Sequence, residues 1–108
     1  MPGVPNTVEL RVGEDFTFEL PGLGTAGYVW QETVHGPTGV IEVSWHRGFT
    51  PGTEPSAVGV SAPEVATIRA LGRGEVTVLL RQVRPWERDK RPLNEHAVVV
   101  RVAPRLDR

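Results

Sequence analysis

The feature that most restricts the fold is a period-two alternation of apolar and polar residues that returns along most of the chain. Val8, Leu10 and Val12 alternate with polar neighbours, and residues 98–102 show a similar pattern near the other end. This period places successive side chains on opposite faces of an extended strand. Apolar residues nowhere recur at intervals of three and four over a helical length, so we expect no significant helix.

Glycine and proline divide this pattern into short segments. The chain of 108 residues has 12 Gly and 10 Pro, which lie between the periodic segments. Residues of these types mark the turns between strands. The predicted strands are Thr7–Val12, Phe16–Leu20, Tyr28–Thr33, Val40–His46, Glu64–Leu71, Glu75–Val83 and Glu95–Ala103.

Seven short antiparallel strands in about 100 residues are typical of an immunoglobulin-like β-sandwich. We therefore predict one all-β domain over residues 1–108, with an ordered core at about residues 7–103. Trp30 lies on the third strand, where this architecture often has a buried tryptophan, and we expect it in the core. Trp45 alternates with Ile41 and Val43 and is also expected to be a core residue.

Composition excludes several classes of protein. The formal net charge is −1, which gives no general attraction to nucleic acid or to a membrane surface. The chain has no cysteine, so disulfides and thiol chemistry are excluded. No apolar run approaches the roughly 18 residues of a membrane span, and residues 1–6 do not resemble a signal peptide. We expect a soluble monomer, cytoplasmic if the chain is complete.

No pattern of residues predicts catalysis, a cofactor or a metal site. His35, His46 and His96 are far apart and lack the spacing of metal ligands. None of the serines lies in a nucleophile motif. We therefore expect that the protein is not an enzyme.

The loop between the last two strands has the strongest functional signal. It contains Arg84-Pro85-Trp86, in which a large aromatic residue lies beyond the reach of the predicted core. Proline stiffens the backbone, and Trp and Arg are enriched at binding hot spots. The other interpretation of Trp86 is a cap that folds back over the end of the sheet.

This loop is also basic, because the segment from Arg81 to Arg91 carries five cations and two carboxylates. Such a loop could bind single-stranded nucleic acid. We disfavour that interpretation because one Trp is a poor stacking platform and the rest of the chain has a net negative charge. The charge is better explained as keeping the loop soluble and steering an acidic partner.

Two motifs make the chain similar to the chagasin-type inhibitors of papain-like cysteine peptidases. The family has Asn-Pro-Thr-Thr-Gly-aromatic-x-Trp before the third strand, where this chain has Leu23-Gly24-Thr25-Ala26-Gly27-Tyr28-Val29-Trp30. The family's Arg-Pro-Trp is present unchanged as Arg84-Pro85-Trp86. The family's third motif is a Gly-rich loop before the fifth strand, and only Gly59 within Ala57–Glu64 matches it.

The resemblance implies that three loops at one end of the sandwich enter the cleft of a papain-like cysteine peptidase. In the first loop Thr25 would lie nearest the catalytic centre, held by Gly24 and Gly27. From its residue type alone, we expect Tyr28 to be part of the scaffold of this loop, with its ring buried and its hydroxyl hydrogen-bonded. Trp86 would pack on aromatic residues of the enzyme rim, and Arg84 would orient its loop or pair with an acidic group. The implied contact residues are Gly24, Thr25, Ala26, Gly27, Val58, Gly59, Val60, Arg84, Pro85 and Trp86.

The departures from the family motifs leave an alternative open. Leu23-Gly24 replaces Asn-Pro, and Ala26 replaces the second Thr. The alternative is a non-inhibitory, immunoglobulin-like module that binds another protein through the same loop end.

Overall fold

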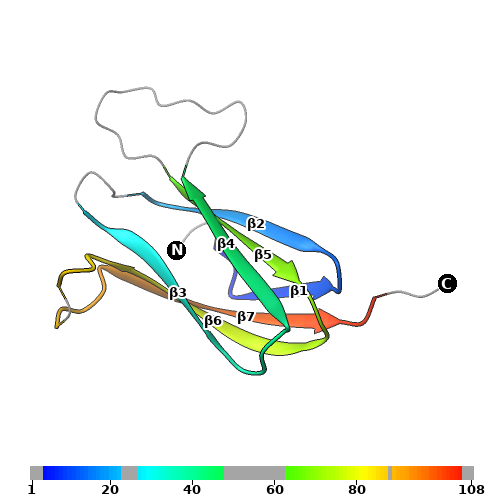
Figure 1. Cartoon of the computed structure of the whole chain (residues 1–108). Coiled ribbons are helices and arrows are strands. Elements are labelled where there is room, and N and C mark those ends of the chain that lie inside the picture. Colours follow the sequence, from blue (N-terminus) through cyan, green and yellow to red (C-terminus); the bar gives the residue numbers. More distant parts are fainter. Residues whose placement is uncertain (1–3, 23–26, 48–62, 88, 106–108) are drawn as a thin grey trace.

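The computed structural model describes residues 4–22, 27–47, 63–87 and 89–105, which form seven strands and no helix. Each strand begins and ends within two residues of its predicted bounds (Figure 1). The described part of the chain thus has no helix that could cross a membrane. The strands are β1 Thr7–Arg11, β2 Asp15–Leu20, β3 Val29–His35, β4 Ile41–Arg47, β5 Glu64–Ala70, β6 Gly74–Val83 and β7 Asn94–Ala103.

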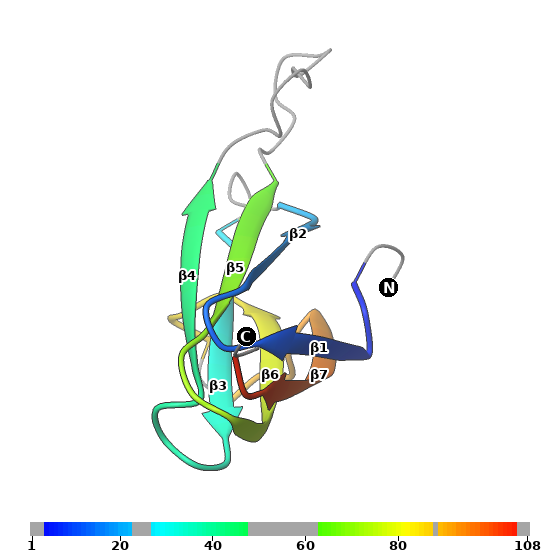
Figure 2. The ribbon, with the colours of Figure 1, turned by 90° about the vertical axis from the view of Figure 1, so that its right-hand side faces the viewer.

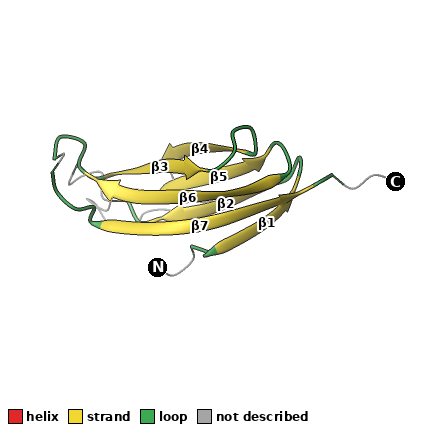
Figure 3. Ribbon diagram, turned by 90° about the horizontal axis from the view of Figure 1, so that it is seen from below, coloured by secondary structure: helices red, strands yellow, loops and turns green. Residues whose placement is uncertain are grey.

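The strands form two sheets that pack as a sandwich, which confirms the predicted all-β class. One sheet has the order β1-β7-β6-β3, and the other has the order β2-β5-β4. In Figure 2, β4 and β5 lie in one layer, while β6, β7 and β1 lie in the other. Figure 3 shows the strands extending along the length of the molecule, and Figure 1 shows that β4 of one sheet crosses β7 of the other obliquely.

One strand pairing differs from the prediction that all strands are antiparallel. β1 pairs in parallel with β7, from Thr7 opposite Val99 to Arg11 opposite Ala103. β1 and β2 do not form a hairpin, because the connection between them crosses from one sheet to the other. β1 pairs with β7 instead, and the two strands run in the same direction. Val12 donates a backbone hydrogen bond to Ala103, whereas the next residue, Gly13, donates to Ala70 of the other sheet. Alternation of side chains determines faces but not strand direction, so the sequence pattern could not reveal this pairing.

The core consists of the inward-facing residues that the alternation predicts. Val98 and Val100 are fully buried, and Trp30 is only 5% exposed. Trp45 is partly buried and packs against this core. Its Nε1 donates a 2.7 Å hydrogen bond to Oε1 of Glu32, which links the edge strands β4 and β3 of the two sheets. The core position predicted for Trp30 is confirmed, whereas Trp45 lies at the margin of the core.

Adjacent valines of β7 provide a matched test of this arrangement. Val98→Ala removes apolar volume from a fully buried site, so it should lower the free energy of unfolding by about 2 kcal/mol or more. Val99→Ala makes the same change on the outer face and should cost about 1 kcal/mol or less. Urea denaturation of both variants measures the difference. Equal losses would contradict the assigned faces.

Candidate functional site

One end of the sandwich is held together at the carbonyl oxygen of Pro21, directly after β2. This oxygen accepts a 2.9 Å hydrogen bond from Nε1 of Trp30 in β3 and a 3.1 Å bond from Nε2 of Gln82 in β6. Gln82 is fully buried, and its Oε1 accepts a 2.8 Å hydrogen bond from Nδ2 of Asn94 at the start of β7. The chain segments that lead into the first and last predicted loops therefore meet at one buried polar junction.

The loop that carries Arg84-Pro85-Trp86 has its own internal hydrogen bonds. The backbone N–H of Glu87 donates to the carbonyl of Arg84 at 2.9 Å, which closes a turn around Pro85 and Trp86. The N–H of Leu93 donates to the carbonyl of Gln82 at 2.8 Å and closes the base of the loop. The Glu87 carboxylate lies 3.6 Å from Arg84 and 3.5 Å from Lys90. These contacts favour a single conformation of the loop before any partner binds.

Arg84 also joins this loop to the start of β3. Its guanidinium carbon lies 4.5 Å from the centre of the Tyr28 ring, a distance at which a cation–π interaction stabilises the pair. Tyr28 thus contacts the loop, although its ring is only partly buried. Arg84 also forms an ion pair with the chain's own Glu87, and its role toward a peptidase stays a prediction.

Trp86 is an exposed aromatic residue with one edge in contact with the first loop. It is 68% exposed, the largest exposed fraction among the large apolar residues that the structure describes. The edge of its ring lies so close to Gly27 that a methyl group on Gly27 would overlap Cη2 and lie 3.0 Å from Cζ2. Gly27 has a φ of +87°, which most side chains disfavour. Trp86 therefore packs on the backbone of the neighbouring loop and leaves most of its surface open.

The structure brings together the predicted site residues that it describes. Gly27 contacts Trp86, Arg84 lies on Tyr28, and Pro85 is exposed between Arg84 and Trp86. The other predicted contact residues lie outside the described residues: Gly24, Thr25, Ala26, Val58, Gly59 and Val60.

The residues that support this site were not predicted from the sequence. Gln82 follows Val76, Val78 and Leu80 on the inward face of β6, so a polar residue in that row was a detectable signal of a buried hydrogen bond. The Pro21 carbonyl gave no such signal, because backbone groups carry no residue-type information. Glu87 was counted only for its charge.

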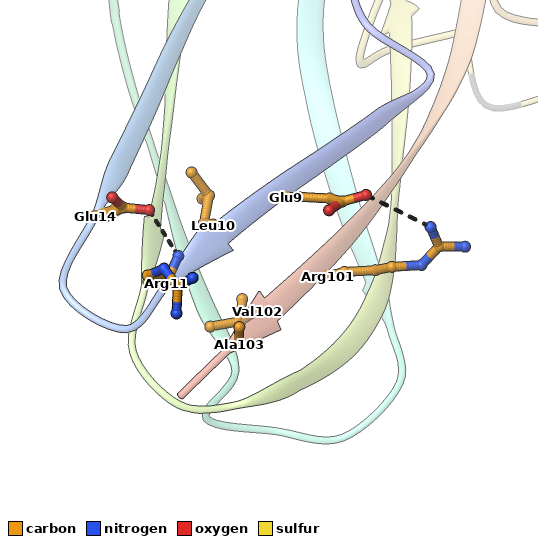
Figure 4. A pocket seen from close by; sticks show the side chains of 7 residues that line it. All are labelled: Glu9, Leu10, Arg11, Glu14, Arg101, Val102 and Ala103. Carbon is orange, nitrogen blue, oxygen red and sulfur yellow. Dashed lines mark hydrogen bonds and ion pairs between the residues drawn. The ribbon is translucent and has the colours of Figure 1, made fainter. Parts of the chain in front are cut away.

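The opposite end of the sandwich has a hollow of about 290 Å³, and three of the charged residues that line it, Glu9, Glu14 and Arg101, have partners (Figure 4). Glu14 accepts a 2.7 Å hydrogen bond from the backbone N–H of Arg11. Arg101 donates to Glu75 at 2.8 Å and lies 4.0 Å from Glu9. The hydrogen bond to Glu75 raises the pKa of Arg101 above its ordinary value. These contacts compensate the charges of Glu9, Glu14 and Arg101 within the chain itself.

The described residues offer no metal centre. They contain no group of three or more His, Asp or Glu side chains that could hold an ion. His35 and His46 are exposed, and Nε2 of His96 lies 3.0 Å from the carbonyl oxygen of Pro5. The surface positions predicted for His35 and His46 are therefore confirmed. His96 is half-buried instead.

Comparisons with known proteins agree with the motifs in the sequence. The profile described as "Chagasin family peptidase inhibitor I42" matches residues 9–100. The crystal structure of EhICP2, a cysteine protease inhibitor from Entamoeba histolytica, superposes with a TM-score of 0.70 at 21% identity, over 90% of this chain and 85% of that chain. The solution structure of amebosin gives a TM-score of 0.65 at 22% identity, over 90% and 88%. No curated protein matches the chain.

The contact between Gly27 and Trp86 can be tested with two glycines that share a backbone conformation. Gly27→Ala and Gly39→Ala both place a side chain at positive φ, +87° and +81°, so both should lose about 1 kcal/mol of stability. Only Gly27→Ala should move Trp86, because nothing lies within 4 Å of the methyl group that Gly39→Ala adds. The ¹⁵N–¹H signals of the three indole groups report this displacement. If neither variant shifts the Trp86 indole signal, the contact is absent in solution.

Proposed function

The chain belongs to the chagasin family of peptidase inhibitors, and we propose that it blocks papain-like cysteine peptidases with the loops at one end of its sandwich. The observation that carries this proposal is Trp86. It is a large exposed aromatic residue that is held in place by its own turn and by the neighbouring loop.

Inhibition of this kind needs shape and rigidity, and it needs no catalytic group in the inhibitor. Binding costs free energy when loops must first become ordered, so loops that are ordered beforehand bind more tightly. The turn between Arg84 and Glu87 and the cation–π contact with Tyr28 provide this order. The exposed face of Trp86 then supplies the apolar surface that hot spots bury.

In the proposed complex, Trp86 packs on the rim of the peptidase cleft beside the first loop. Thr25 lies nearest the catalytic cysteine, and Val58, Gly59 and Val60 lie along the cleft as extended backbone. These two assignments rest on the family motifs, since both segments lie outside the described residues. The chain acts as a monomer and remains uncut, because it occludes the cleft without presenting a scissile bond in the catalytic geometry.

The family match and the solved relatives also indicate whether this protein is an enzyme. The matching profile describes inhibitors, and EhICP2 is named as one, which confirms the expectation that this protein is not an enzyme.

Two exposed apolar residues at opposite ends of the sandwich test the proposed site. Trp86→Ala should weaken the inhibition constant for papain or a cathepsin by about 2 kcal/mol, which is about 30-fold, because it removes the central apolar contact. Leu71→Ala removes an exposed apolar side chain, 46% exposed, from the turn between β5 and β6 at the other end and should leave inhibition unchanged. Steady-state kinetics with a fluorogenic peptide measure both constants.

Two results would contradict the proposed function. One is a wild-type protein that fails to inhibit several papain-like peptidases at micromolar concentration. The other is an equal effect of Trp86→Ala and Leu71→Ala on inhibition. Trypsin serves as the unrelated peptidase, and the wild type should leave its activity unchanged.

A further inference from the structure

A basic hollow of about 230 Å³ lies beside the Arg84-Pro85-Trp86 loop, on the outer side of the β3–β6 pair. Three cations line it, namely Arg81, Arg84 and Lys90, against the single carboxylate of Glu87. Pro85 forms part of the same wall. The lining therefore carries an excess of positive charge in a concave surface.

Two of these cations have partners within the loop. Glu87 lies 3.6 Å from Arg84 and 3.5 Å from Lys90, and Arg84 also lies over the Tyr28 ring. One carboxylate is thus shared between two cations. It has no comparable contact with Arg81.

Arg81 is the cation of the hollow for which no ion pair is found in the described part of the chain. Its Nε is buried and has no hydrogen-bond partner among the described residues. The strand register places Gln31 and Glu95 on either side of Arg81 in the sheet. Glu95 is exposed and does not line the hollow, and no ion pair joins it to Arg81 within the described ranges.

The guanidinium group of Arg81 makes no side-chain hydrogen bond to the described residues, so a partner that brings an acceptor to this group can satisfy its donors. The guanidinium group presents its N–H donors in a planar fork that matches a carboxylate, with which it forms two parallel charge-assisted hydrogen bonds. A hollow of this size is large enough to admit the end of an Asp or Glu side chain. Its chemistry therefore selects a carboxylate over an apolar or cationic group.

The position of the hollow links it to the proposed binding surface. Arg84 and Pro85 line the hollow and also precede Trp86 in the same turn. A partner surface that covers Trp86 extends naturally over the mouth of the hollow.

We infer that the hollow receives an Asp or Glu side chain from the rim of the target peptidase, with Arg81 as the cation that binds it. This inference rests on the proposed function and adds to it the chemistry of the partner. Peptidases with a carboxylate at this point of the rim are bound more tightly, while those with Lys or Arg there are disfavoured by repulsion.

Inhibition constants of three variants test the inference. Arg81→Gln removes the charge and most donors, and it should weaken inhibition of a sensitive peptidase by about 10-fold or more. Arg81→Lys keeps the charge but not the fork, so its effect should be smaller. Arg73→Gln makes the same change of charge at an exposed site in the β5–β6 turn, at the other end of the sandwich, and should behave as wild type.

A scan of the enzyme identifies the partner group. Each rim carboxylate of the sensitive peptidase is changed to its amide, Asp to Asn or Glu to Gln. One of these changes should weaken wild-type inhibition by about the same factor as Arg81→Gln and should have no further effect on the Arg81→Gln variant. This coupling also distinguishes direct contact from a structural defect, since a variant that is weakened only by a local distortion would still lose affinity when the enzyme carboxylate is removed.

The outcomes separate the two proposals. If Arg81→Gln inhibits as wild type does while Trp86→Ala is impaired, the acidic contact is wrong and the proposed function stands. The same conclusion holds if no rim carboxylate couples to Arg81, which would make the hollow a solvated surface feature. If the wild type inhibits no papain-like peptidase, the proposed function fails and the acidic contact fails with it.

Discussion

The loop end of this protein depends on the carbonyl oxygen of Pro21. It lies directly after β2 in one sheet and accepts hydrogen bonds from Trp30 and Gln82 of the other. Because Gln82 is fully buried, loss of this junction would leave polar groups unsatisfied, which is more costly than the net worth of the bonds themselves. The chain lacks cysteine, so this polar junction and the apolar core must hold the two sheets together without a disulfide.

The junction sets the positions of the functional residues in two steps. It fixes where the chain leaves β2, enters β3 and leaves β6, and those points are the bases of the first and last loops. Above it, the loops hold each other: Arg84 lies on the Tyr28 ring, and the edge of Trp86 rests on Gly27. The exposed face of Trp86 is therefore presented by a rigid support, which reduces the entropy that a binding partner must overcome.

The sequence allowed most of the fold and part of the site to be predicted, for identifiable reasons. Alternation set the strands and the faces of residues such as Val98 and Trp30, because burial on one side imposes a period of two. Alternation could not reveal the parallel pairing of β1 with β7, because the pattern of buried residues is the same whichever direction a strand runs. Arg84, Pro85 and Trp86 were recognised from residue type, whereas the contact of Trp86 with Gly27 and the buried Nε of Arg81, which lacks a hydrogen-bond partner among the described residues, depend on three-dimensional placement.

The most direct test of the account is an NMR titration of the ¹⁵N-labelled protein with a papain-like peptidase whose catalytic cysteine is blocked by a small group. The account predicts that signals of Gly27, Arg84 and the Trp86 indole shift or broaden at stoichiometric peptidase. It also predicts that signals of Gly13, Gly39 and Gly72, at the opposite end, stay in place. Perturbations centred on the opposite end, or no perturbation with an enzyme that the protein inhibits, would contradict it.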